Sequence, residues 1–327
     1  MHWSSSVLLY FASLAASQST NTTTPPCKRC NETAHGFASL NGGTTGGNGG
    51  PTVFATTYQE LRDYAARAGP LIIRINTTLT ASPRGYEIPI ASNKTIIGVG
   101  QNGKVSGGGF AIQGTRNIIL RNLEVSDTRI PSDWPGKTED WDGIQVDNGT
   151  NIWIDHMKFA RMNDGLIDLR RDSTYITVSS TILSEHNKAL GIGWTTNVTA
   201  RITINDNFFN STNARNPSAD NIAQCHMYNN YFRNCTAYGT YARGNTSLLL
   251  ENSYYDSTFD PVVAGPNATI RSSWIKFGKG VEGERTLSVR PEGVFRARDY
   301  YQYSLRDPYD LPNDIPYFAG PQEDVGS

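Results

Sequence analysis

The sequence lacks an excess of charge, and beyond its first residues it lacks long apolar runs. Its 29 Lys and Arg residues almost balance its 30 Asp and Glu residues, so the net charge at pH 7 is −1. Overall charge therefore does not indicate a nucleic acid partner, and affinity for a polyanion must come from local charge. No stretch after residue 17 is apolar enough to cross a bilayer, which predicts that no membrane is involved.

Residues 1–17 have the pattern of a secretory signal peptide. The apolar run Val7–Ala15 is too short to span a membrane and is followed by small residues suited to cleavage. We therefore expect a secreted, extracellular protein with a flexible Ser/Thr/Pro-rich tail over residues 18–35 and a single domain over 36–327. Ten Asn-x-Ser/Thr sequons agree with a glycoprotein: Asn21, Asn31, Asn76, Asn93, Asn148, Asn197, Asn210, Asn234, Asn245 and Asn267.

Cysteine is scarce, with four residues at Cys27, Cys30, Cys225 and Cys235. Their even number in an oxidising compartment predicts disulfides, but three pairings are possible and the sequence does not choose among them. The spacing of Cys27 and Cys30 also occurs in redox and zinc sites. It lies here in a Thr/Pro-rich tail without a neighbouring strand and helix, which favours a structural disulfide.

Helical patterns are rare, and the clearest one begins at a capping box, Thr57-Tyr58-Gln59-Glu60. Apolar residues continue at helical spacing until Gly69-Pro70, so we expect a short amphipathic helix that covers one end of the sheet that follows. The glycine-rich run 41–50 contains neither GxGxxG nor GKS/T after a strand, so a packed loop is favoured over a phosphate-binding loop.

The rest of the chain repeats the loose pattern x-Ile-x-Ile-x-Asn-x-x-Phe. Successive copies start 20 to 34 residues apart, at Asn117, Asn151, Tyr175, Arg201, Gln224, Ser247 and Asn267. Alternating apolar residues without helices in between predict short strands stacked turn upon turn. The sixth position is polar in most copies, as expected of a corner that must satisfy turn backbone groups, and it makes His156 structural rather than catalytic. Past Lys279 the pattern fades into a coil tail laid along the solenoid.

One stretch, 139–188, collects acidic residues around the phrases Asp142-Gly143-Ile144 and Asp164-Gly165-Leu166. Stacked strands would place Asp142, Asp164 and Lys188 in one column, with Asp140 and Asp168 beside it. Carboxylates so close together repel one another unless a cation binds, and calcium prefers such all-oxygen sites. Zinc would need histidine or cysteine, for which only His156 and His186 lie near. A solvated acidic edge without a metal remains the alternative.

Three segments resemble the pectate lyases of polysaccharide lyase family 1. Asn151–His156 is similar to their WIDH segment, Asn213–Pro217 to their Arg-x-Pro segment, and Glu185–Leu190 to their DH-x-K element. The likeness runs in order from about Gly36 to Phe277. The resemblance implies an all-β, right-handed parallel β-helix, and a fungal-type secreted pectate lyase that acts on polygalacturonate of plant cell walls, as a monomer.

The resemblance also implies roles for individual residues. Asp142, Asp164 and Asp168 match the family's Ca²⁺ ligands, and Asp140 matches a residue that holds further calcium once substrate is bound. Position 164 is usually Glu in the family. Lys188 and Arg215 match the catalytic residues that grip the sugar carboxylate and take the C5 proton, and Arg243 matches a substrate-binding arginine. Asp220 stands where many relatives have a second arginine.

The implied reaction is calcium-dependent β-elimination, which leaves a 4,5-unsaturated sugar end. Because arginine is normally protonated, a base role for Arg215 predicts an alkaline rate optimum. A guanidinium clamp, with hydroxide as the base, is the alternative for this residue. Pectin lyase, which lacks the calcium carboxylates, and a non-catalytic carbohydrate-binding solenoid are the competing functions. A polygalacturonase is disfavoured because no Gly-His-Gly element is present.

Overall fold

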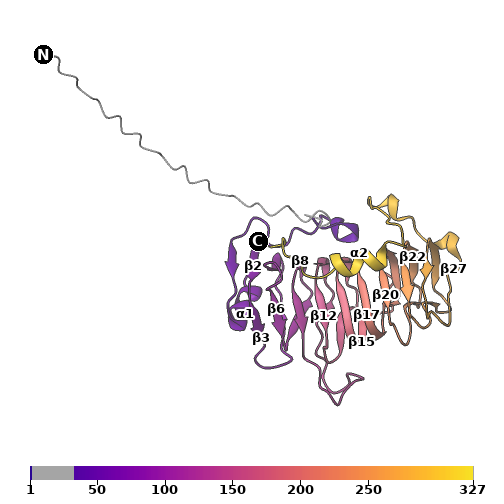
Figure 1. The fold of residues 1–327 in the computed structure, drawn as a ribbon, viewed down its shortest axis with the longest axis horizontal. Helices are drawn as coiled ribbons and strands as arrows, with labels where there is room; N and C mark the ends of the chain where they lie inside the picture. Colours follow the sequence, from indigo (N-terminus) through magenta and orange to yellow (C-terminus); the bar gives the residue numbers. More distant parts are fainter. Residues whose placement is uncertain (2–32, 327) are drawn as a thin grey trace.

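The computed structural model describes Met1 and residues 33–326, whose strands stack into a parallel β-helix (Figure 1). This confirms the predicted fold class. Apart from Met1, the predicted signal peptide lies outside the described residues, as do Cys27, Cys30 and the sequons at Asn21 and Asn31. In the described part of the chain no helix has both the length and the apolarity needed to cross a bilayer.

The first sheet has eleven strands, all parallel except that the last pair, β25 and β27, is antiparallel. Its order is β1 (Thr52–Phe54), β2 (Leu71–Ile75), β5 (Lys94–Gly98), β8 (Arg116–Arg121), β11 (Thr150–Asp155), β14 (Thr174–Ser179), β16 (Ala200–Asn205), β19 (Ile222–Tyr228), β22 (Ser247–Glu251), β25 (Thr269–Ser273) and β27 (Ser288–Val289).

The second sheet has sixteen strands in two ladders that share the long strand β15 (Ile182–Gly193). We call them the second and third ladders. The second ladder contains β3 (Thr78–Thr80), β6 (Lys104–Ser106), β9 (Glu124–Ser126), β12 (Lys158–Ala160), β15, β17 (Phe208–Ala214), β20 (Tyr231–Arg233), β23 (Tyr254–Asp256) and β26 (Lys276–Phe277). The third contains β4 (Glu87–Pro89), β7 (Gly109–Gln113), β10 (Ile144–Asp147), β13 (Gly165–Arg170), β15, β18 (Ser218–Asp220), β21 (Thr240–Arg243) and β24 (Val262–Ala264).

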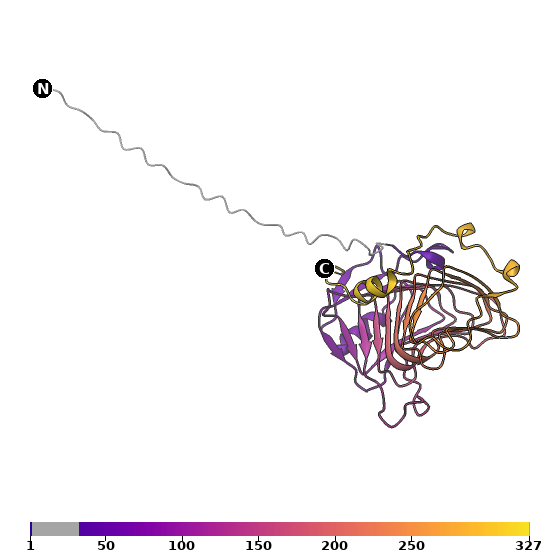
Figure 2. The same ribbon diagram turned by 45° about the vertical axis from the view of Figure 1, so that its right-hand side comes forward.

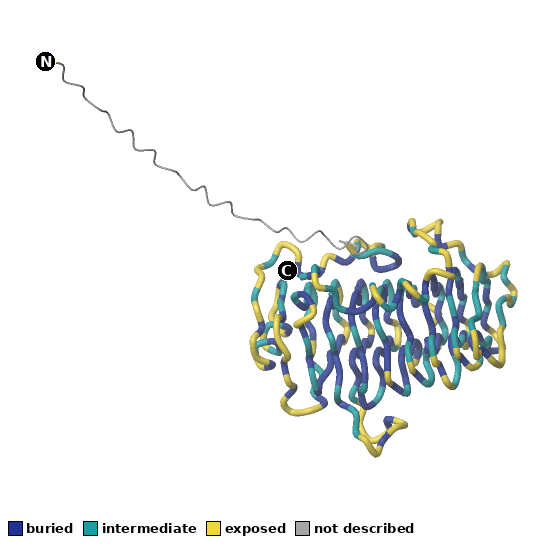
Figure 3. Tube along the Cα trace, viewed as in Figure 1, coloured by how far each residue is buried: buried dark blue, intermediate teal, exposed yellow. Residues whose placement is uncertain are grey.

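The coils enclose an apolar core that runs the length of the solenoid (Figures 2 and 3). In the first sheet Leu120, Ile154 and Val178 occupy matching register positions on successive strands, and all are fully buried. The Phe232 ring stacks on the next coil with its centroid 4.3 Å from that of Tyr255. The Cys225 thiol is free and buried, as is the Cys235 thiol, so the two do not pair with each other. The alternation of inward- and outward-facing side chains along each strand thus produces one continuous apolar interior.

Polar residues at the corner after the first sheet bond between coils, as predicted. The sixth-position residues adopt left-handed backbone angles, and their side chains bond between coils, for example from Asn229 to Asp206 at 3.3 Å. A second set of such bonds, which the sequence did not indicate, lies one residue later, in Thr181, Asn207, Asn230 and Ser253. Asn207 accepts from the Thr181 N–H at 2.9 Å and donates to the Val178 carbonyl at 3.0 Å. This buried ladder satisfies backbone groups of the bend.

The Asn207→Ala variant is expected to lose roughly 3 kcal/mol of unfolding free energy, because a buried donor and acceptor would be left unpaired. Urea denaturation followed by circular dichroism measures this loss. Asn48→Ala, at an exposed turn position, is the matched control and should change the unfolding free energy by less than about 0.5 kcal/mol. Equal stability of the two variants would contradict a supporting role for the ladder.

The N-terminal helix α1 (Tyr58–Ala66) begins as predicted, with both hydrogen bonds of the capping box between Thr57 and Glu60. The helix packs against β2 and β4 at one end of the solenoid (Figure 1). Three short 3₁₀ helices flank the coils: η1 (Gly36–Ser39), η2 (Pro291–Gly293) and η3 (Ala297–Asp299).

The C-terminal tail lies along the solenoid, as predicted. The Asn252 amide donates to the Arg306 carbonyl at 2.7 Å, and Asn122 bonds to Gln322 in the same way. The tail is not all coil, however, because it contains helix α2 (Leu311–Phe318). Pro316 argues against a helix in the sequence, but Leu311 and Ile315 pack on Phe208 and Tyr231, and this tertiary contact outweighs the local preference.

Candidate active site

The candidate residues gather where strands of the third ladder begin. The predicted column of Asp142, Asp164 and Lys188 is wrong by one position, because Gly165, not Asp164, is the register partner of Lys188. The reason is an extra residue in the turn before β13: the Asp164 N–H bonds to Trp141 O, whereas the Gly143 N–H bonds to Gly165 O. Asp142 accepts a hydrogen bond from the Gly165 N–H, so the two coils remain tied together.

Three of the four predicted metal ligands converge. One carboxylate oxygen each from Asp140, Asp142 and Asp164 lie within 4.8 Å of one another. Asp140 is exposed and Asp142 is fully buried, with Asp164 between these extremes. The Gln145 amide donates to Asp140 at 3.2 Å and to Asp142 at 3.1 Å. This is an all-oxygen, carboxylate-rich arrangement of the kind that hard divalent cations bind.

Asp168, the fourth predicted ligand, lies beside this group but forms an ion pair with Arg215. Its carboxylate accepts two hydrogen bonds from Arg215, at 3.1 and 3.2 Å. A side chain at position 165 would lie 2.9 Å from one oxygen of Asp168 and equally close to one oxygen of Asp142. Because glycine has no Cβ, both carboxylates can lie this close to the strand at position 165.

The crowded carboxylates resist ionisation. Burial, and the neighbouring Asp168, Glu87 and Asp164, raise the pKa of Asp142 well above its usual range. Burial likewise raises the pKa of Asp168 to about 6, although Arg215 acts in the opposite direction. A bound cation would relieve this repulsion, which is the electrostatic reason to expect one here.

Glu87, at the start of β4, is a fifth carboxylate that the sequence motifs did not indicate. Its side chain accepts a hydrogen bond from the Asp142 N–H at 2.7 Å, and burial raises its pKa to about 8. Strand β4 pairs with β7, which pairs with β10. Through these pairings Glu87 shares a register position with Gly109 and Gly143, one residue beyond that of Asp142, so extending the column of Asp142 along the ladder would not have found it.

The basic residues lie on the adjoining coils. The Lys188 ammonium contacts the Asp164 carboxylate and donates to Gly136 O at 2.9 Å. Arg215 lies over the Trp194 ring, 5.1 Å from its centroid. Arg215 and Trp194 line a cavity of about 210 Å³ together with Ile192, Ser218, Asp220 and Arg243. The predicted substrate arginine and the unusual aspartate thus face the same space as Arg215.

The two histidines near the acidic stretch have separate positions. His156 is buried and bonds to Asp155 at 2.7 Å, in agreement with its predicted structural role. His186 is also buried and bonds to the backbone carbonyl of Asp164. Burial lowers the pKa of His186 to about 4, so its ring is neutral at working pH and can donate from Nε2. His186 therefore helps to hold the turn that carries Asp164.

The raised carboxylate pKa values predict a pH-dependent effect of divalent cations on stability. A carboxyl group whose pKa is raised by folding stabilises the folded state at pH values below its unfolded-state pKa. This stabilisation is lost as the pH rises through its folded-state pKa. For Asp168 this pH window runs from 3.8 to about 6, and the free energy of unfolding lost across it is on the order of 3 kcal/mol. We expect calcium to raise Tm by roughly 5 °C more at pH 8 than at pH 5.

Differential scanning calorimetry in EDTA and in calcium measures this difference. The Asp142→Asn variant should lose most of the calcium effect. Asp63→Asn, which changes an exposed carboxylate on α1, should keep it. A calcium effect that is equal at both pH values would contradict the coupling of cation binding to these carboxylates.

Comparison with known proteins agrees with this fold. Residues 10–273 match the family model described as pectate lyase. A pectate trisaccharide-lyase from Bacillus licheniformis is 34% identical over 302 residues, covering 87% of this chain and 85% of the relative. A probable pectate lyase A from Aspergillus flavus is 30% identical over 287 residues, covering 84% of each chain. A pectate trisaccharide-lyase from Thermotoga maritima is 34% identical over 214 residues, and there the match spans 62% of this chain and 58% of the relative.

A solved structure resembles the chain as a whole. The crystal structure of a pectate lyase from Bacillus sp. N165 in complex with trigalacturonate superposes with a TM-score of 0.70 and 26% identity. The match covers 88% of this chain and 98% of that one. Fold and site thus define a polysaccharide lyase built on a parallel β-helix. The chain belongs to the pectate lyase family, which confirms the family that the three sequence motifs indicate.

Proposed function

We propose that the protein is a calcium-dependent lyase that cleaves α-1,4-linked polygalacturonate by β-elimination and releases 4,5-unsaturated oligogalacturonides. The observation that carries the proposal is the convergence of Asp140, Asp142 and Asp164 next to Lys188 and Arg215. Relatives named for pectate cleavage, and a similar structure with bound trigalacturonate, support the choice of substrate.

The donor set fits calcium better than other metals. Carboxylate oxygens of Asp140, Asp142 and Asp164 would hold the ion, with Asp168 as a further ligand once Arg215 moves away from it. The group contains no histidine, since His156 bonds to Asp155 and His186 bonds to the Asp164 backbone carbonyl, which disfavours zinc. When bound, calcium supplies positive charge to the sugar carboxylate and so makes the neighbouring C–H bond more acidic.

The protein's own groups carry the proton and charge steps. Lys188, held at the edge of the acidic group, donates to the substrate carboxylate and stabilises the charge that develops there. In its neutral form, which alkaline pH favours, Arg215 takes the C5 proton and becomes the guanidinium cation. The C–H electron pair becomes the C4–C5 double bond, and the C4–O bond breaks. The departing oxygen then takes a proton from solvent. Arg243 lies in the same cavity and pairs with an adjacent uronate carboxylate, replacing the positive charge that Asp220 does not provide.

A pectin lyase acting on methyl esters is the second candidate. The group of Asp140, Asp142 and Asp164 argues against it, because a neutral methyl ester is a poor ligand for a cation. Free uronate carboxylates would complete the coordination. Substrates of graded methyl esterification separate the two functions. We expect the rate to fall as esterification rises.

The direct test follows the absorbance of unsaturated ends during polygalacturonate cleavage, with and without EDTA, from pH 6 to 10. We expect absorbance to increase only with calcium, and faster at alkaline pH. Reducing ends without absorbance would indicate hydrolysis and overturn the proposal. Chromatography of the products then reports whether trimers accumulate, as the names of two relatives suggest.

We further propose that the protein is secreted and acts as a monomer on plant cell walls. The apolar run at residues 7–15 and the sequons of the mature chain support export. Expression in a secreting host with N-terminal sequencing of the medium fraction tests cleavage after about residue 17. Light scattering of the purified protein tests the oligomeric state.

A further inference from the structure

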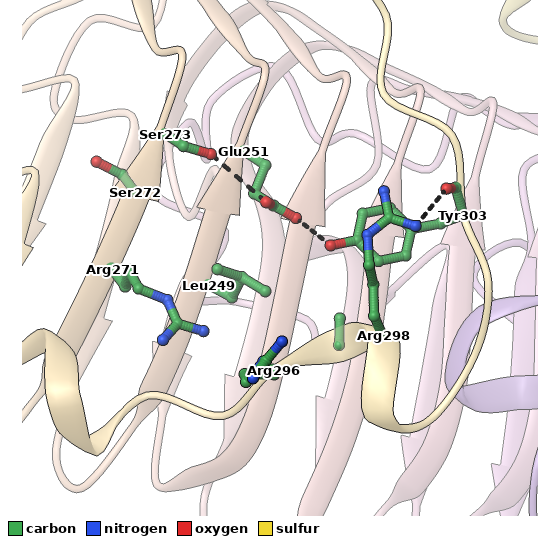
Figure 4. Close-up of a pocket in the computed structure, with 9 residues that line it drawn as sticks. Leu249, Glu251, Arg271, Ser272, Ser273, Arg296, Arg298 and Tyr303 are labelled. Carbon is green, nitrogen blue, oxygen red and sulfur yellow. Dashed lines mark hydrogen bonds between the residues drawn. The ribbon is translucent and has the colours of Figure 1, made fainter.

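A second cavity lies on the first sheet near the C-terminal end of the solenoid, and it shares no lining residue with the cavity of the candidate active site. It has a volume of about 330 Å³ and is covered by the tail segment that contains η3 (Figure 4). Nine residues line it: Leu249, Glu251, Arg271, Ser272, Ser273, Arg296, Ala297, Arg298 and Tyr303. Strands β22 and β25 supply one wall and the tail supplies the other, so the cavity forms only when the tail docks.

The lining is strongly cationic for a chain with net charge −1. Three arginines face one glutamate, which leaves a local charge of +2. The Arg296 side chain has no hydrogen-bond or ion-pair partner among the residues that the structure describes. Arg271 donates only to the Phe295 carbonyl, and Arg298 contacts Tyr303 through its carbonyl and its ring, 4.4 Å from the centroid. No carboxylate of the described chain pairs with any of the three guanidinium groups.

The single acidic group in the cavity is already engaged. Glu251 accepts hydrogen bonds from the Tyr303 hydroxyl at 2.7 Å and from Ser273 at 3.4 Å (Figure 4). It also accepts one from His226 at 3.0 Å. These bonds orient its oxygens toward the protein and fix Tyr303 beside the cavity. The guanidinium groups of Arg271, Arg296 and Arg298 are therefore available to bind the anionic groups of a ligand.

We propose that this cavity binds uronate residues of the polysaccharide, as a second saccharide site separate from the catalytic cleft; this rests on the proposed function. Planar guanidinium forks match carboxylates in bidentate geometry, and several of them close together select a ligand with more than one negative charge. The apolar floor of Leu249 and Ala297 suits the face of a sugar ring. The site keeps the enzyme on a polyanionic chain between cleavage events.

The test measures binding without turnover. Isothermal titration calorimetry with trigalacturonate is carried out in EDTA on the Arg215→Ala protein, with and without Arg296→Ala and Arg298→Ala. We expect the two added substitutions to weaken the binding at least tenfold. Arg67→Ala with Arg116→Ala, which removes two exposed arginines elsewhere, should leave Kd within twofold. Replacing Arg296 and Arg298 by lysine should give intermediate affinity, and calorimetric unfolding checks that every variant is folded.

A second measurement separates this inference from the proposed function. With Arg215 intact, Arg296→Ala and Arg298→Ala should leave kcat on trigalacturonate within twofold and raise KM for long polygalacturonate about threefold or more. Binding that is insensitive to the two arginines, or displaced equally well by inorganic phosphate and trigalacturonate, would overturn the saccharide assignment. Arginine-dependent binding in a protein that forms no unsaturated product would overturn the proposed reaction and leave the site intact.

Discussion

The Arg215→Ala variant is expected to cleave polygalacturonate about 10³-fold more slowly than the unmodified protein. The expectation follows from the position of Arg215 over Trp194 and beside Asp168, where its guanidinium faces the cavity next to the acidic group. General bases contribute roughly 10²- to 10⁴-fold to rates of this type. Initial rates of unsaturated-end formation at saturating calcium measure the loss. Because Arg215 pairs with Asp168, which is almost fully buried, this variant should also have a lower Tm, and calorimetric unfolding checks that it remains folded.

A charge-preserving variant decides between the base and the clamp roles of Arg215. Arg215→Lys keeps a positive charge in the cavity but loses the planar guanidinium, whose Nη1 donates to both carboxylate oxygens of Asp168. If arginine is the base, this variant should be nearly as slow as Arg215→Ala. Its rate should then depend on alkaline pH differently from the rate of the unmodified protein. Recovery of more than about a tenth of the activity, with an unchanged dependence on hydroxide, would favour the clamp. Arg243→Ala, in the same cavity, should mainly raise KM.

Removal of the cation, or of its most buried ligand, is expected to have the second large effect. Asp142→Asn leaves the shape of the side chain nearly unchanged but removes one negative charge from the fully buried member of the acidic group. We expect the calcium concentration for half-maximal rate to rise at least 100-fold and the rate at moderate calcium to fall by a similar factor. Excess EDTA should reduce the unmodified protein to background.

The control for this prediction is Asp133→Asn, in the loop of residues 127–143 near the acidic group. Asp133 accepts hydrogen bonds from Lys137 and Thr138 and orders the loop without joining the carboxylate group. Its substitution should alter KM while leaving the calcium requirement within about threefold. Undiminished turnover in excess EDTA would end the proposal that the acidic group holds a catalytic cation.

The repeat, the N-terminal helix and the general location of the site follow from the sequence. Apolar residues at alternate positions every 20 to 34 residues specify stacked strands, because one face of each strand must be buried. The capping box at Thr57 specifies the start of α1 through contacts within four residues. The family motifs single out Asp142, Lys188 and Arg215, all of which the fold brings to one edge of the third ladder.

Only the tertiary structure decided the details that depend on register and on distant contacts. An extra residue before β13 moved Asp164 out of the column. The pairing of β4 with β7 brought the Glu87 carboxylate within hydrogen-bond distance of the Asp142 N–H. The contact of α2 with Tyr231, and the cavity beneath Arg296, exist because the tail docks on strands far earlier in the chain. Local patterns set which residues face inward, because that choice depends on neighbours in sequence. The pairing of coils is set by packing and hydrogen bonds between segments more than twenty residues apart, which no short stretch of sequence encodes.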